Sequence, residues 1–90
     1  MSDQSQAPRE FDPARREDIT RLEQLISGLD ARLDTPQGLM REHLDSARSY
    51  LLASMPDEYK MTLKLANEVL PQVEPPELRT RLDDFIKQQV

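Results

Sequence analysis

Few side chains in this sequence are of a kind that supports catalysis. His43 is the only histidine, and the chain contains no cysteine. A nucleophilic serine or threonine generally needs an adjacent base, usually histidine, that a third group orients. His43 stands at the edge of an apolar stripe with Glu42 and Asp45 nearby, a pattern typical of a boundary residue on a helix. We therefore expect no catalytic residue, and the sequence predicts a protein that is not an enzyme.

Metal and cofactor sites are not predicted either. A di-iron site in a helical bundle uses Glu-x-x-His pairs on facing helices, but the residue three before His43 is Met40 and there is no second histidine. Zinc sites of the cysteine type are excluded because the chain has no cysteine. Gly28 and Gly38 are the only glycines and do not form a glycine-rich phosphate loop. The sequence thus predicts no cofactor and no metal.

Pairs of neighbouring acids, such as Asp57-Glu58 and Asp83-Asp84, are the remaining candidates for acid-base chemistry. Neighbouring residues in a helix project about 100° apart. Such carboxylates are poorly placed to share a proton or a substrate. Solvent-exposed charge is the better interpretation of both pairs.

The charge of the chain argues against a nucleic-acid partner. The formal net charge is −5, from 17 acidic and 12 basic residues. Acids and bases alternate, as in residues 15–18 and 79–84, so no segment has the basic excess that binding to phosphates requires. No apolar run approaches the roughly 20 residues that span a bilayer, and the N-terminal residues lack the pattern of a secretory signal. We expect a cytoplasmic protein with neither a nucleic-acid nor a membrane partner.

The length and composition predict one small domain with a thin core. The chain has 90 residues, of which 37% are hydrophobic and 32% are charged. A chain of this length buries only about 60 to 65% of its unfolded surface. Small cores are commonly supplemented by disulfides, a metal or self-association, and disulfides are excluded here. Association with a second chain is therefore an expected source of stability.

Prolines divide the chain into four helical segments. Residues 1–11 lack an apolar period and are predicted to form a disordered tail, followed by a single helical domain over 12–90. Proline favours the first position of a helix, so we expect helices over about 13–33, with Asp12 as the cap, over 36–54, from 56 to about 70 or 73, and over 76–89. The Asp34-Thr35-Pro36 break is short enough to make the first two helices antiparallel neighbours. Ser54 is expected to cap the third helix.

Apolar residues recur at helical spacing in each segment. In the first, the spacing of three and four residues resembles a coiled-coil seam, and Gly28 inside it is expected to mark a bend or a close approach of another helix. Apolar and polar residues never alternate for long enough to indicate a strand. The fold class is therefore all-α: a three- to four-helix bundle with a long N-terminal antiparallel helical hairpin. The expected core stripes are Ile19, Leu22, Ile26, Leu29 and Leu33; Met40, Leu44, Ala47, Leu51 and Met55; Tyr59, Leu63, Ala66, Leu70 and Val73; and Leu78, Leu82, Phe85 and Ile86.

Five apolar residues lie off these stripes and are the candidates for partner binding. One interpretation is that the two middle helices are central in the bundle and contact neighbours on two sides. The other is that these residues form an exposed patch for a second copy or another protein. Methionine suits an adaptable interface, although it also fills cores. The five residues are Leu39, Tyr50, Leu52, Met61 and Leu65.

Three functional hypotheses follow. The favoured one is a non-enzymatic protein-protein interaction module, a homodimer or a subunit of a complex, held by apolar contacts between helices. The alternative is a small acidic regulator or chaperone, of the secretion-chaperone or toxin-neutralising kind, that masks a basic partner. Its affinity would fall with increasing salt. The third hypothesis is an enzyme or ligand carrier with a pocket between helices.

Overall fold

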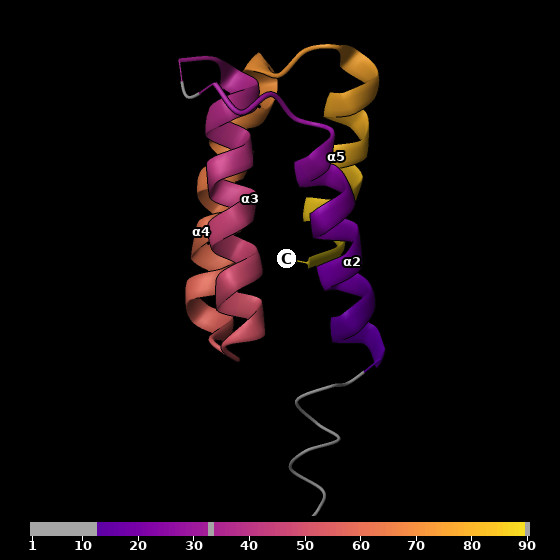
Figure 1. Cartoon of the computed structure of the whole chain (residues 1–90), viewed down its shortest axis with the longest axis vertical. Coiled ribbons are helices and arrows are strands. Elements are labelled where there is room, and N and C mark those ends of the chain that lie inside the picture. Colours follow the sequence, from indigo (N-terminus) through magenta and orange to yellow (C-terminus); the bar gives the residue numbers. More distant parts are fainter. Residues whose placement is uncertain (1–12, 33, 90) are drawn as a thin grey trace, which may run out of the picture.

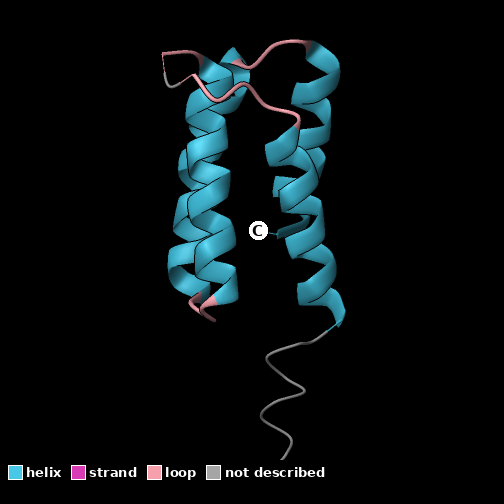
Figure 2. Cartoon of the chain, viewed as in Figure 1, coloured by secondary structure: helices cyan, strands magenta, loops and turns pink. Residues whose placement is uncertain are grey.

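The computed structural model describes residues 13–32 and 34–89, and this part of the chain forms a four-helix bundle. The elements are α2 (Pro13–Ser27), α3 (Pro36–Leu52), α4 (Pro56–Val69), the short 3-10 helix η1 (Leu70–Gln72) and α5 (Pro76–Gln89). Successive α-helices run in opposite directions, up, down, up and down (Figure 1). The described residues contain no strand (Figure 2). The all-α prediction is confirmed, whereas the predicted disordered tail over 1–11 lies outside the described residues.

Each of the four described α-helices begins at a proline, as the sequence predicts. Thr35 caps α3, because its hydroxyl oxygen accepts a hydrogen bond from the backbone N–H of Gly38 at 3.0 Å. The prediction that Ser54 caps the next helix is wrong. Met55 occupies the cap position of α4 without a side-chain hydrogen bond. Ser54 instead has a left-handed backbone, with a φ of 59°, and its hydroxyl accepts a hydrogen bond from Arg15 at 2.7 Å.

The first helix ends earlier than its apolar spacing predicts. It stops at Ser27, and the chain then crosses the end of the bundle to α3 (Figure 1). Leu29 is buried from this connection and not from a helix, while the predicted seam residue Leu33 lies outside the described residues. A Cβ on Gly28 would lie 3.6 Å from its nearest neighbour, the carbonyl oxygen of Leu25. This is an ordinary contact within the same turn, so the predicted close approach of another helix at Gly28 is wrong.

The core is one cluster of buried apolar side chains to which all four described α-helices contribute. The predicted stripes of α4 and α5 are buried throughout, and so are the first three members of the α3 stripe. In α2, Leu22 and Leu25 are buried, while Ile19 and Ile26 are only partly so. The buried apolar residues are Leu22, Leu25, Leu29, Met40, Leu44, Ala47, Tyr59, Leu63, Ala66, Leu70, Val73, Leu78, Leu82, Phe85 and Ile86.

The helix pairs differ in how closely they pack. The backbones of α3 and α4 make the most extensive contact, and α2 packs beside α3. The backbones of α2 and α5 stand farther apart, and side chains bridge them, as in the hydrogen bond from Arg21 to Gln88. Within the described ranges, none of the helices is long and apolar enough to cross a membrane. The α3–α4 hairpin is therefore closely packed, and the α2–α5 seam is looser.

Candidate interaction surface

A short reversal between α3 and α4 sets the register of the hairpin. The backbone N–H of Ala53 donates to the carbonyl oxygen of Ser49 at 3.0 Å, and that of Met55 donates to Tyr50 at 2.9 Å. Pro56 then begins α4. The last two turns of α3 therefore lie beside the first two turns of α4. Side chains from the two helices share one surface there.

A groove of about 350 Å³ follows from this register. Tyr50 contributes from α3, and the other lining residues come from the first three turns of α4. Tyr50 also packs against the core cluster, so its ring forms a fixed wall. Thr62 is buried, and its hydroxyl donates to the carbonyl oxygen of Glu58 at 2.8 Å. We call this feature the α3–α4 groove; its lining residues are Tyr50, Asp57, Glu58, Met61, Thr62 and Leu65.

The groove unites three of the five residues that the sequence singles out for partner binding: Tyr50, Met61 and Leu65. Leu39 lies on the same side of α3 as Tyr50, about three turns away, because the two project about 20° apart around the helix axis. Leu52 projects about 160° from Tyr50 and so lies on the other side of α3. The structure therefore does not place Leu52 in the groove.

Exposure distinguishes the two interpretations of these five residues. The exposed fractions are 64% for Met61, 54% for Leu52, 44% for Leu65 and 40% for Leu39. Tyr50 alone is among the partly buried residues that pack against the core. Packing within the bundle therefore accounts for Tyr50 only, and the other four side chains are left partly uncovered.

Asp57, Glu58 and Thr62 are groove residues that the sequence does not indicate as partner-binding residues. Asp57 and Glu58 fit the positive first turn of α4, which is a sufficient local reason for their presence. Their spacing from Met61 contained a usable signal, since residues three and four apart share a helix face. Thr62 could not be recognised in this way because it lies between the core stripe and the groove.

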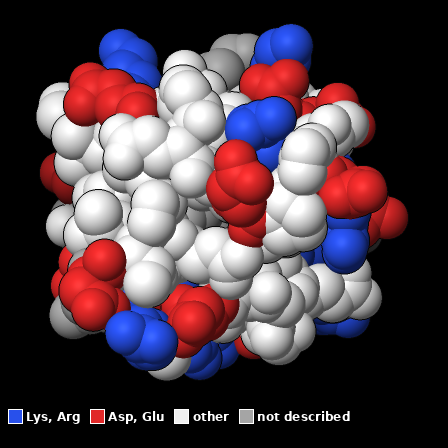
Figure 3. Space-filling view, turned by 90° about the horizontal axis from the view of Figure 1, so that it is seen from above, with Lys and Arg blue, Asp and Glu red and all other residues white. Residues whose placement is uncertain are grey.

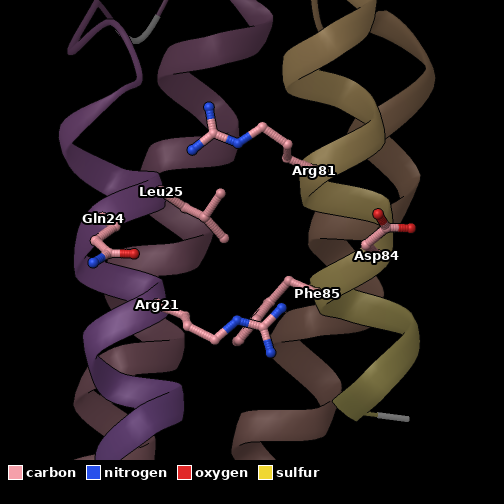
Figure 4. A pocket seen from close by; sticks show the side chains of 6 residues that line it. All are labelled: Arg21, Gln24, Leu25, Arg81, Asp84 and Phe85. Carbon is pink, nitrogen blue, oxygen red and sulfur yellow. The ribbon is translucent and has the colours of Figure 1, made fainter.

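The second candidate is a pocket of about 200 Å³ between α2 and α5. The guanidinium groups of Arg21 and Arg81 extend into it from opposite helices, with Leu25 between them (Figure 4). The guanidinium of Arg21 lies over the ring of Phe85 and also donates to the side chain of Gln88. Arg21 is thus engaged in holding the two helices together, and the pocket is the gap between their bridging side chains.

A buried tyrosine strengthens the same seam. The Tyr59 hydroxyl donates to the side-chain oxygen of Gln89 at 2.7 Å, and the Gln89 amide donates to Asp18 at 3.2 Å. Burial raises the pKa of the Tyr59 hydroxyl well above its usual range, and the negative charge of Asp18 adds to the rise. The neutral phenol is the form that this network holds, so Tyr59 is a structural residue at neutral pH.

Charges on the described surface are mixed. Seen from the end of the bundle where the α2–α3 and η1–α5 connections lie, basic side chains are interspersed with acidic ones, and neither sign forms a continuous patch (Figure 3).

Across residues 13–32 and 34–89, no group of three or more His, Asp or Glu side chains is placed to hold a metal ion. No family model, curated protein or solved structure matches the chain.

Proposed function

We propose that this chain is a non-enzymatic protein-protein interaction module that binds its partner through the α3–α4 groove. The observation that carries the proposal is that Tyr50, Met61 and Leu65 come from two helices and line one groove while Met61 and Leu65 remain exposed. Apolar side chains gathered at a surface favour association, because covering them removes apolar area from water at about 25 cal/mol per Å².

The mode of binding that this surface supports is the addition of a helix. A groove between two antiparallel helices accepts the apolar side of a third helix, whose anchors recur at intervals of three and four residues. The Tyr50 ring offers a rigid wall because it packs on the core, and Met61 offers an unbranched, adaptable side chain. A subunit of a complex and a homodimer are both arrangements in which such a surface is covered.

The remaining parts of the proposal rest on the sequence. A single histidine and no cysteine leave few catalytic combinations, so we propose a binding role without turnover. The net charge of −5 argues against nucleic acid as the partner. A cytoplasmic location belongs to the same proposal, and cell fractionation with an antibody to the chain tests it.

Site-specific photo-crosslinking in the native cell tests the proposal. A photoreactive amino acid replaces Met61 in one strain and Glu17, which is exposed on α2, in another. We expect a discrete crosslinked product of higher mass at position 61 and none at position 17. Equal labelling at both positions, or no product at position 61 under conditions where the chain is abundant, would contradict the proposed groove.

A further inference from the structure

We propose that the α3–α4 groove takes a basic amphipathic helix of another protein, with apolar side chains in the groove and Lys or Arg beside them. This inference rests on the proposed function and specifies the chemistry of the partner. It follows from the charges of the residues that line the groove and from the mismatch between this surface and a second copy of itself.

The lining of the groove carries negative charge only. Asp57 and Glu58 stand at one end, while the remaining lining residues are apolar or hydroxyl-bearing, and none is Lys or Arg. Both carboxylates are exposed. A partner that covers Met61 and Leu65 must also lie beside these carboxylates. A cation at that position gains attraction, whereas an acid there is repelled.

The cations of the hairpin do not line the groove. On α3, the Arg48 guanidinium forms an ion pair with Glu23 of α2 at 2.9 Å, and Arg41 projects about 20° from Arg48 on the same side. On α4, Lys64 lines a separate pocket against α5, while Lys60 and Lys64 project about 60° and 20° from Asp57 and so flank the groove on its Asp57 side.

These four residues are all the Lys and Arg of α3 and α4. Among the described residues, no ion pair joins either groove carboxylate to these cations, so a cation of a binding partner can pair with both carboxylates.

A second copy of the chain is a poor occupant of the groove. In a two-fold symmetric dimer the same surface patch faces itself. Whichever way the two grooves align, each copy brings Asp57 and Glu58 to the other and no Lys or Arg among the lining residues to pair with them. Like charges across an interface oppose association. The groove is consequently better matched to a different chain of opposite charge.

Two designed peptides probe this inference directly. Both are labelled amphipathic helices of about 18 residues with leucine at intervals of three and four, and their polar positions are all lysine in one and all glutamate in the other. Binding to the full chain is measured by fluorescence anisotropy. We expect the lysine peptide to bind at least about tenfold more tightly than the glutamate peptide, and its affinity to fall as salt rises from about 50 to about 500 mM.

Matched variants separate groove binding from general attraction to an acidic protein. The Asp57→Asn, Glu58→Gln double variant removes both groove carboxylates, and the Glu17→Gln, Glu77→Gln double variant removes two exposed acids of α2 and α5. Leu65→Gln changes an exposed leucine inside the groove, and Leu52→Gln changes one outside it. All four positions or pairs are exposed, so the variants are expected to fold, and circular dichroism checks this.

The outcomes discriminate between the inference and its alternatives. We expect the groove variants to weaken the lysine peptide about tenfold and the control variants to weaken it less than about twofold. Equal loss in both double variants would assign the attraction to net charge and overturn the inference. Preference for the glutamate peptide would overturn it as well. A dimer in sedimentation equilibrium that Leu65→Gln dissociates would make the occupant a second copy, leaving the proposed function intact. If the chain binds neither peptide and does not self-associate, the result would contradict both the inference and the proposed function.

Discussion

The guanidinium group of Arg21 lies over the aromatic ring of Phe85, with its central carbon 5.0 Å from the ring centroid. This contact joins α2 to α5, the pair whose backbones stand far apart, and the same side chain donates a hydrogen bond to Gln88. We expect Arg21→Ala to lower the free energy of unfolding by about 1 to 2 kcal/mol, because it removes both interactions. Urea unfolding measures the change. Arg16→Ala, at an exposed arginine of the same helix, should stay within about 0.5 kcal/mol of the parent.

Leu63 and Leu65 of α4 form a matched pair for testing the core and the groove. Leu63 is fully buried, whereas Leu65 is 44% exposed and lines the groove. Leu63→Ala should cost about 2 to 5 kcal/mol because it leaves a cavity, while Leu65→Ala should cost below about 1 kcal/mol. Chemical unfolding followed by circular dichroism gives both values. Similar losses for the two variants would mean that Leu65 belongs to the core of the bundle and not to a binding surface.

The Tyr59 hydroxyl makes stability fall at alkaline pH. Burial, with the charge of Asp18, raises the pKa of this hydroxyl in the folded chain above its unfolded value of about 10. Because the folded state holds the proton more tightly, the contribution is complete below about pH 10 and is lost progressively as the pH rises above it. We expect Tyr59→Phe to flatten this alkaline loss in thermal unfolding curves, at a cost of about 1 kcal/mol near neutral pH for the hydrogen bond to Gln89. An alkaline loss of unchanged size in the variant would mean that Tyr59 is not its source.

Thr35 is expected to stabilise the start of α3. Its hydroxyl accepts the backbone N–H of Gly38, which would otherwise lack a partner in the first turn. Thr35→Ala should therefore lower the free energy of unfolding by about 0.5 to 2 kcal/mol. Thr80→Ala, at an exposed position within α5, is the matched change and should be nearly neutral, since alanine is the better helix former there. A loss of equal size in both variants would point to threonine removal in general and not to the cap.

Local signals explain how much of the fold was predictable. Helices begin at Pro36, Pro56 and Pro76, because proline favours the first helical position. This preference depends only on the local backbone, so it can be recognised in the sequence. The pair Asp83 and Lys87, 2.9 Å apart, is another feature of a single helix. The end of α2, by contrast, was not predictable from the apolar spacing. That spacing continues to Leu29, although the helix ends at Ser27. Leu29 lies in the following turn and is still buried, so its apolar side chain gave no sign of where the helix ends.

The candidate site was only partly predictable because it depends on the pairing of helices. Apolar spacing identified Tyr50, Met61 and Leu65 as residues outside the core stripes. Their union in one groove required the register of the α3–α4 reversal. The same reasoning grouped Leu52 with them, although it projects to the other side of α3. The stacking of Arg21 on Phe85 had no local signal, since charged and aromatic residues on separate helices meet only in the folded chain.

The looser seam between α2 and α5 has a consequence for the order in which the bundle assembles. Its bridging hydrogen bonds join residues 67 and 71 positions apart, whereas the α3–α4 reversal links immediate neighbours along the chain. Closing the longer loop costs more chain entropy, and the backbones it unites gain less contact in return. We expect amide protons of α2 and α5 to exchange with deuterium through an opening that leaves the α3–α4 hairpin paired. The α3–α4 groove would then persist in a molecule in which α2 and α5 have already separated.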